Sequence, residues 1–432
     1  MITDFILSDF KSYKKGQLPL GTLTLLIGAN AAGKSNLIEA LRLLCWLAQG
    51  QKLSNIQYAV NQGDQVIRGR VDDLCYKGTS KFTLGCRVNS TQWNQLALTL
   101  DCRQGELHIS HEQIFTTNKI LYELNQASEA ERTDVIIAYN NFTKGKNKPQ
   151  ILCSDQMAVF TQLNTPAQFN SKYEKSQKII PETVQEYQKV LQNILFLDPI
   201  PAKMREYSFK SDKQLRGDGG NLSSVLWWLW QNQPQNQEVI LNFIRSVPEQ
   251  DIIGLDFIDG PRGEVMVRLQ ETFGNSHHFY DAGLLSDGTL RVLAMAAALL
   301  SANKGSLVVI EEIDNGIHPS RADHLLTTLQ QIAKDRQLRV LLSTHNPALM
   351  DALPDEVLGD VVFCYREPTA GDSRLIRLGD LENFPSLILQ GKLGQLVTSG
   401  IVNRFVKSPQ TVEERKQKAM AWLERLREYG NE

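Results

Sequence analysis

The chain has 432 residues, of which 42% are hydrophobic, so it is long enough for two or three domain-sized units with full cores. Its 46 basic and 48 acidic side chains give a formal net charge of -2, which excludes a global field that would draw the whole chain onto nucleic acid or an anionic membrane. The N-terminus lacks a signal-peptide pattern, and no uncharged apolar run reaches about 18 residues, so we expect a cytoplasmic protein without membrane contact. The six cysteines lack metal-ligand spacing and are interpreted as reduced core thiols.

The first predicted elements are a strand, a glycine-rich loop and a helix. Residues 21–28 are apolar with interspersed threonines, and residues 36–49 carry apolar side chains at helical spacing. Residues 81–88 and 95–102 follow, with alternating apolar side chains and flanking turn residues. These two segments predict an antiparallel layer after the first helix.

The middle of the chain, from about residue 115 to 193, is rich in Asn, Gln, Lys and Glu. It contains helical pieces such as ETVQEYQKVLQNIL, and we predict a helical insertion. Sustained heptads are missing from its sequence, so a long coiled-coil arm is excluded.

The second half alternates strands and helices. NLSSVLWWLWQN predicts a buried helix, and a further helix follows LLSDGT. The strands 307–310 and 340–343 flank another helix, and this alternation predicts a mainly parallel sheet with crossover helices. Residues 412–429 predict a mixed-charge C-terminal helix.

The loop from Gly28 to Ser35, GANAAGKS, has the phosphate-binding pattern. Its glycines allow successive backbone N–H groups to surround phosphate oxygens, while Lys34 reaches the β and γ phosphates and the Ser35 hydroxyl ligates Mg²⁺. The position between a predicted strand and a predicted helix strengthens the pattern. We therefore predict ATP and Mg²⁺ as the ligands.

The segment SLVVIEEIDNGIHPS places two acids at the carboxyl end of a buried strand, where α/β sheets bind ligands. Glu311 is predicted to hold the Mg²⁺ shell, and Glu312 to activate the attacking water as general base. STHNP ends the next strand and would place His345 beside a γ-phosphate. LSDGT opens a helix whose N–H groups would face an anion, although on its own it is equally an ordinary helix cap.

The ordered set GANAAGKSN, LLSDGTLR, LVVIEEIDNGIHP and LLSTHNP resembles the ABC-type ATPases of the RecF, SMC and OLD group. It is most similar to the RecF-like AAA-type ATPases of bacterial defence clusters, such as the Septu ATPase group, without a fused nuclease. The resemblance covers about residues 1–110 and 195–365 and implies an α/β ABC/SMC-type P-loop ATPase head. Together with the elements predicted above, this gives a mainly parallel core sheet, an antiparallel β layer and a helical insertion, which the resemblance does not cover. Its expected parts are an N-terminal lobe (1–115), the insertion (116–194), a C-terminal lobe (195–365) and a C-terminal extension (366–432).

The resemblance also implies roles for single residues. Ser286, Asp287, Gly288 and Thr289 match the signature loop, which in that family contacts the ATP of the opposite protomer. Asp314, Asn315 and Gly316 match the D-loop, His345 matches the switch histidine, and Phe10 to Tyr13 match a stretch that approaches the adenine. The implied catalytic residues are Lys34, Glu312 and His345, the implied metal ligands are Ser35 and Glu311, and the implied nucleotide contacts are Lys11, Ser12, Asn30, Gly33, Lys34, Ser35, Asn36, Ser286, Asp287, Gly288 and Asp314.

Three positions depart from the family pattern. Asp287 stands where a second glycine is common, and Glu311 stands where Asp is usual. No glutamine can be assigned to the Q-loop, for which Gln62 and Gln65 are weak candidates. Arg205 and Asn221 lie in segments that also resemble the family, where function and packing are equally good explanations.

The leading functional hypothesis is an ATPase that dimerises, or forms a higher oligomer, through shared ATP sites and regulates a separate effector such as a nuclease in antiphage defence. The sequence shows no nuclease metal set after His345. Two alternatives stay open at this point: a RecF-like repair ATPase that clamps duplex DNA, and a low-turnover ATP-dependent scaffold. Glu312 argues against the scaffold, because a site without turnover needs no general base.

Overall fold

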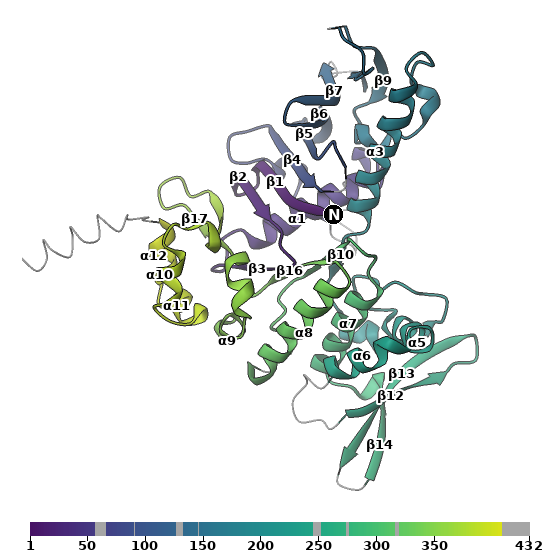
Figure 1. Cartoon of the computed structure of the whole chain (residues 1–432), viewed down its shortest axis with the longest axis vertical. Helices are drawn as coiled ribbons and strands as arrows, with labels where there is room; N and C mark the ends of the chain where they lie inside the picture. The colour runs from purple at the N-terminus through teal and green to yellow at the C-terminus, as the bar shows by residue number, and fades with distance from the viewer. Residues whose placement is uncertain are drawn as a thin grey trace, which may run out of the picture.

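The computed structural model describes residues 1–56, 66–89, 91–126, 133–145, 147–244, 252–273, 276–315 and 319–407. It has the expected α/β class, with a mainly parallel core sheet and a separate antiparallel sheet (Figure 1). The weak Q-loop candidates Gln62 and Gln65, Gly316 of the D-loop match and the predicted helix 412–429 lie outside the described residues. Within the described part of the chain, no helix is long and apolar enough to cross a membrane.

The core sheet has six strands in the order β10-β15-β16-β3-β17-β18. The first five run parallel, and β18 pairs with β17 in the antiparallel direction. Their bounds are Leu195–Leu197 (β10), Leu307–Ile310 (β15), Arg339–Ser343 (β16), Leu23–Ile27 (β3), Val362–Arg366 (β17) and Ser373–Arg377 (β18). The carboxyl ends of β3, β15, β16 and β17 therefore meet at one edge of the sheet.

Alternate residues of the core strands face two different hydrophobic cores, because side chains in a strand point to opposite faces. Leu26 of β3 belongs to the core shared with the antiparallel sheet, whereas Leu25 and Ile27 belong to the core of the C-terminal helices. All five residues of β3 are buried, as expected for a parallel strand covered on both faces.

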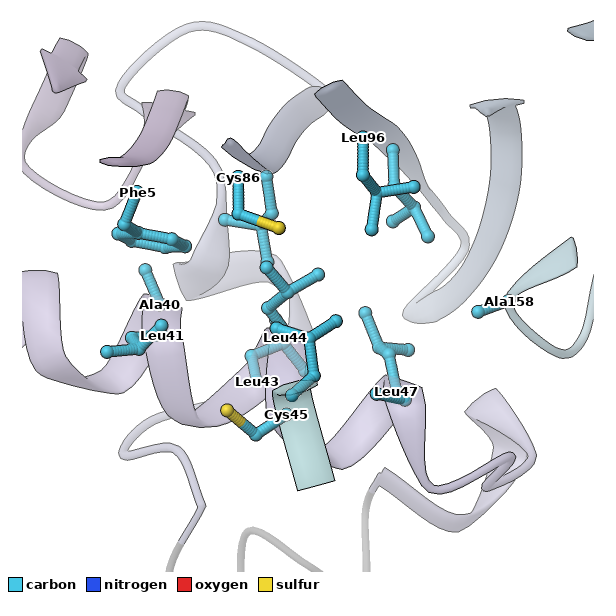
Figure 2. Close-up of a cluster of buried hydrophobic side chains, with 14 of the residues drawn as sticks. Phe5, Ala40, Leu41, Leu43, Leu44, Cys45, Leu47, Cys86, Leu96 and Ala158 are labelled. Atoms are coloured by element: carbon cyan, nitrogen blue, oxygen red, sulfur yellow. The ribbon is translucent and has the colours of Figure 1, made fainter. Parts of the chain in front are cut away.

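The antiparallel sheet has eight strands in the order β2-β1-β4-β5-β6-β7-β8-β9. Helix α1 (Lys34–Ala48) packs beneath it, and Figure 2 shows apolar side chains of this helix, including Leu44, close to Phe5, Cys86 and Leu96 of the sheet. The strand bounds are Ile2–Phe10 (β1), Tyr13–Pro19 (β2), Lys81–Val88 (β4), Gln95–Arg103 (β5), Glu106–Thr116 (β6), Lys119–Gln126 (β7), Asp134–Tyr139 (β8) and Gln150–Ser154 (β9).

The predicted helical character of residues 116–194 is wrong for the first part of this insertion. Strands β7, β8 and β9 continue the antiparallel sheet, and the long helix α3 (Glu174–Gln192) begins only afterwards. The physical reason is visible in β8, where buried and exposed residues alternate, so its apolar side chains cover the core while the other face meets solvent. The polar composition of the insertion hid this period of two.

The C-terminal lobe combines helices with a small antiparallel sheet, beside the core sheet in Figure 1. Its sheet contains β11 (Ser208–Phe209), β12 (Ile252–Asp259), β13 (Glu264–Phe273) and β14 (Ser276–Asp281). The helices of the second half are α4 (Pro201–Met204), α5 (Leu222–Asn232), α6 (Gln237–Ile244), α7 (Asp287–Ser301), α8 (Ala322–Asp335), α9 (Pro347–Asp351), α10 (Phe384–Ile388), α11 (Leu393–Thr398) and α12 (Ile401–Lys407). Short 3₁₀ helices are η1 (Leu53–Asn55), η2 (Val71–Leu74), η3 (Val159–Thr161), η4 (Pro166–Gln168), η5 (Pro234–Asn236), η6 (Ala282–Leu284), η7 (Pro319–Arg321), η8 (Asp355–Asp360) and η9 (Leu378–Asp380).

Glu112 of β6 is a fully buried acid that joins the sheet to the insertion. Its carboxyl group accepts hydrogen bonds from the Tyr122 hydroxyl (2.7 Å) and from the backbone N–H groups of Val159 (2.7 Å) and Phe160 (2.6 Å). Burial nevertheless raises the pKa of Glu112 from 4.5 to about 7 and outweighs these three donors, which favour the charged form.

We predict that Glu112 makes stability depend on pH between about 4.5 and about 7. In this window the folded protein binds more protons than the unfolded chain, so the free energy of unfolding falls as pH rises, by up to about 3 kcal/mol. Glu112→Gln cannot titrate and should flatten this slope. Urea unfolding of both proteins at several pH values measures it, and equal slopes would contradict the prediction.

Candidate active site

A pocket of about 380 Å³ lies at the carboxyl ends of the core strands, where open α/β sheets bind ligands. Segments far apart in the sequence contribute to it: the loop after β3, the start of α1, and residues that follow β15 and β16. The described residues that line it are Ala29, Asn30, Ala31, Gly33, Lys34, Ser35, Asn36, Ile38, Arg68, Glu311, Glu312, Ser343, Thr344, His345 and Arg366. The structure therefore brings the glycine loop, the two acids and the histidine together.

Two glycines let the loop after β3 curl against the C-terminal hairpin. Gly28 (φ 151°) and Gly33 (φ 122°) adopt backbone conformations that favour glycine. A side chain at Gly28 would collide with the Cys364 carbonyl group, and one at Gly33 would collide with the Ser373 hydroxyl. The Tyr13 hydroxyl donates to the Gly33 carbonyl at 3.1 Å, so β2 and the β17–β18 hairpin both support the loop.

Lys34 holds its ammonium group within the concave side of the loop. Its Nζ donates to the carbonyl oxygens of Gly28 (2.6 Å) and Ala29 (3.2 Å). Burial lowers the pKa of Lys34, while the charges of nearby groups, Glu312 among them, oppose that shift. The Lys34 side chain and the glycine loop thus line the same pocket, and such a loop with a cation suits phosphate oxygens.

Glu312 has a left-handed backbone conformation, with φ 48°, which is costly for a residue with a side chain. Three hydrogen bonds hold it: its N–H donates to the Ser343 hydroxyl (3.0 Å), and its carbonyl and carboxylate accept from the backbone and side chain of Asn315 (both 2.9 Å). This network fixes the carboxylate at the pocket wall. Such an arrangement is what a general base requires.

Glu311 lines the same pocket but has a cationic partner. Its Oε1 accepts from Arg42 Nη2 at 3.0 Å, and the Arg42 guanidinium lies over the ring of Phe196. The remaining lone pairs of the carboxylate still allow a metal contact. The role of Glu311 as a metal ligand stays a prediction.

His345 lies beside Asp314 of the D-loop match. Its Nδ1 lies 3.6 Å from Asp314 Oδ2, and the Thr344 hydroxyl donates to Asp314 Oδ1 at 2.6 Å. The Asp314 carboxylate is almost fully buried, whereas the imidazole is half exposed and faces the pocket. The Asp314 carboxylate therefore lies behind the imidazole, on the side away from solvent.

Lys11 and Ser12 are not among the described residues that line the pocket. The Lys11 ammonium is drawn to the buried carboxylate of Glu39 on α1, and the Ser12 hydroxyl accepts from the Asn36 amide at 2.9 Å. Arg68 pairs with the same Glu39 and itself reaches the pocket. The two residues expected near the adenine thus support α1 and the loop from the side.

The match to the signature loop lies at the start of α7, and none of the described residues lining the pocket comes from it. The Ser286 hydroxyl caps the helix by accepting from the Thr289 N–H at 3.1 Å. Asp287 accepts from Arg205 Nη2 at 2.6 Å, which gives Arg205 a defined contact with this loop. Ser286 and Asp287 are exposed, and Gly288 follows them in the first turn.

Asn221 closes a loop. Its side-chain oxygen accepts from the Arg216 N–H at 2.9 Å, and its amide donates to the Gln214 carbonyl at 2.9 Å. Since Asn221 is 1% exposed, the structure favours the packing explanation for this residue.

Three arginines near the pocket were missed by the sequence analysis: Arg42, Arg68 and Arg366. Arg366 ends β17 and donates from Nε to the Ala31 carbonyl at 3.1 Å, so it joins the hairpin to the glycine loop. The position of Arg366 at the carboxyl end of a strand could have indicated this residue from the sequence. Arg42 and Arg68 lie within or after helical segments without a motif.

No group of three or more His, Cys, Asp or Glu residues in the described part of the chain could hold a metal ion by itself. Mg²⁺ bound with a nucleotide needs only one or two protein ligands, because phosphates and water supply the others. The donor set of Ser35 and Glu311 fits a metal that arrives with its substrate.

Comparisons with known proteins place the chain in a wider group. The model of the family described as "AAA domain, putative AbiEii toxin, Type IV TA system" matches residues 23–96 and 162–351. An ATP/GTP phosphatase of Helicobacter pylori is 25% identical over 372 residues, which are 85% of this chain and 90% of that protein. The solved Smc head bound to the C-winged helix domain of ScpA is 13% identical with a TM-score of 0.49 and covers 87% of this chain and 97% of that chain. The SMC head domain from Thermotoga maritima is 12% identical with a TM-score of 0.39 and covers 87% of this chain and 98% of that chain.

We predict that Gly28→Ala lowers stability by more than about 2 kcal/mol, because the new methyl group would meet the Cys364 carbonyl in a strained backbone conformation. Gly359→Ala is a matched control, since a side chain there meets no atom within 4 Å and its φ is not positive. Thermal unfolding of both variants measures the difference. Equal midpoints would show that the hairpin is not pressed against the loop.

Proposed function

Because this chain belongs to that AAA-domain family and is an ABC/SMC-like P-loop ATPase, we propose that two copies of it close on ATP and Mg²⁺ and hydrolyse the ATP at shared sites. The ATPase cycle then controls a separate effector protein, such as a nuclease, in antiphage defence. One observation supports hydrolysis above all: the Glu312 carboxylate lines the same pocket as the Lys34 loop.

In the proposed site, loop N–H groups around Gly33, together with Lys34, bind the β and γ phosphates and stabilise the charge that develops on them. Asn30 within the loop and Asn36 just after it complete the contacts with the nucleotide. Mg²⁺ would be held by Ser35 and Glu311 and would neutralise phosphate charge when bound.

Glu312 then takes the proton of the attacking water, and His345 donates a hydrogen bond to the γ-phosphate. Asp314, through its contact with Nδ1, holds the imidazole ring in one orientation. Asn315 orients the Glu312 carboxylate in the same way, by donating a hydrogen bond to it at 2.9 Å. Each reacting side chain thus has a neighbour that orients it.

The exposed signature loop supports the dimer. Ser286, Asp287 and Gly288 stand at the N-terminus of the fifteen-residue helix α7, where backbone N–H groups and the helix dipole favour an anion. Leu284, just before them, is 69% exposed. We propose that this loop completes the pocket of a second copy, as the match to the signature motif implies.

We predict that Glu312→Gln retains ATP binding but hydrolyses ATP orders of magnitude more slowly, because the amide keeps the shape of the carboxylate without accepting a proton. The same variant should accumulate a dimer with ATP, visible by light scattering. Lys34→Ala is the comparison: it should lose ATP binding and therefore form no dimer. Phosphate release and nucleotide binding are measured on all three proteins.

An unchanged hydrolysis rate in Glu312→Gln would show that another residue is the general base, and Glu311 would be the first alternative. Wild-type turnover in a folded Lys34→Ala protein would refute the assignment of the site. A wild-type protein that binds ATP with almost no phosphate release would instead favour the low-turnover scaffold.

The effector contact is proposed for the insertion or the C-terminal extension. On the insertion, Ile136 of β8 and Leu152 of β9 are paired across the strands and are 37% and 66% exposed. They form an apolar spot on the outer face of the sheet. Since β7 to β9 belong to this sheet, deleting the insertion would damage the fold, and surface substitution is the sharper test.

We predict that the Leu152→Arg variant no longer co-purifies with the protein encoded by the neighbouring gene. The variant should still hydrolyse ATP. Gln150→Arg, exposed on the same strand, is the matched control. Truncation after residue 407 tests the other candidate segment. Full biological activity from the chain alone, with no partner retained, would contradict the proposal of an effector.

A further inference from the structure

Cys75 and Cys102 form a pair outside the nucleotide pocket. Their Sγ atoms lie 3.0 Å apart, and both residues are partly exposed, whereas Cys45, Cys86, Cys153 and Cys364 are buried. The interpretation of all six cysteines as core thiols therefore fails for these two. We propose that Cys75 and Cys102 are a modification site at which a peroxide forms an intramolecular disulfide.

The two sulfur atoms differ in their surroundings. The Cys102 thiol can donate to Cys75 Sγ, and this hydrogen bond lowers the pKa of Cys75 despite burial and the negative charges of Asp101, Asp72 and Asp9. The same hydrogen bond, with burial, raises the pKa of Cys102. Cys75 is thus the attacking thiolate, and Cys102 is the thiol that resolves the intermediate.

The chemistry balances with hydrogen peroxide as the oxidant. The Cys75 thiolate attacks one peroxide oxygen, the O–O bond breaks, and after protonation one water leaves and Cys75 becomes a sulfenic acid. Cys102 then attacks the Cys75 sulfur, the S–O bond breaks, and a second water carries away the oxygen and the Cys102 proton. Two thiols and one peroxide give one disulfide and two waters, and the sulfur atoms need to approach by only about 1 Å.

The disulfide would join a strand end to the segment that borders the nucleotide pocket. Cys75 follows η2 and pairs with Phe10 of β1, and the Tyr76 N–H next to it donates to the Asp9 carbonyl at 2.6 Å. Cys102 belongs to β5. The same stretch as Cys75 contains Arg68, which lines the pocket, so the bond would fix this stretch to the antiparallel sheet.

The test uses the full-length protein, treated with hydrogen peroxide under native conditions and then alkylated after unfolding. The number of free thiols should fall from six to four, and peptide mass spectrometry should find Cys75 joined to Cys102. Dithiothreitol should restore all six thiols. The oxidised protein should unfold at a higher temperature than the reduced protein, because the cross-link restricts the unfolded chain.

Variants separate the two sulfur atoms. Cys102→Ser should stop at the Cys75 sulfenic acid, which dimedone traps, and Cys75→Ser should form neither product. Cys153→Ser, at a buried cysteine, is the matched control and should give the wild-type yield of the Cys75–Cys102 peptide. Six thiols remaining in the wild-type protein, or cross-links that join other cysteines, would overturn the proposal, and neither result bears on ATP hydrolysis.

Discussion

The pocket depends on the close contact between the glycine loop and the β17–β18 hairpin. Gly28 has no side chain, and this allows its backbone to lie against the Cys364 carbonyl. Arg366 then reaches the Ala31 carbonyl, and Ser373 lies beside Gly33. These residues, distant in the sequence, therefore support the shape of the loop from outside, in addition to the bonds of Lys34 within it. With this shape the loop and Lys34 line one pocket.

A second set of contacts explains why residues near the N-terminus matter to a site that they do not line. The carboxylate of Glu39 is nearly buried between Lys11 and Arg68, and removing either cation would leave a poorly compensated charge. Ser12 and Asn36 extend the same support to the start of α1. The N-terminal strands therefore position the helix that follows the glycine loop.

Sequence reasoning succeeded where the pattern is local. The strands at 81–88 and 307–310 have the predicted bounds, and the glycine loop, Glu312 and His345 meet in one pocket as expected. It failed where distant residues pair. Lys11 is paired with Glu39, and Arg366 and the Cys75–Cys102 pair are brought into place by tertiary contacts alone. The strands β7 to β9 pair with their sequence neighbours, but they were missed because the segment that contains them is rich in polar residues.

The position of β3 in the core sheet has a consequence for synthesis on the ribosome. β3 is made early, yet both of its neighbours, β16 and β17, come from the last quarter of the chain. At ordinary translation rates the wait is on the order of tens of seconds, during which an apolar strand has no partner on either edge. In the nascent chain β3 therefore stays unpaired, and open to pairing with other chains, until β16 and β17 have emerged from the ribosome.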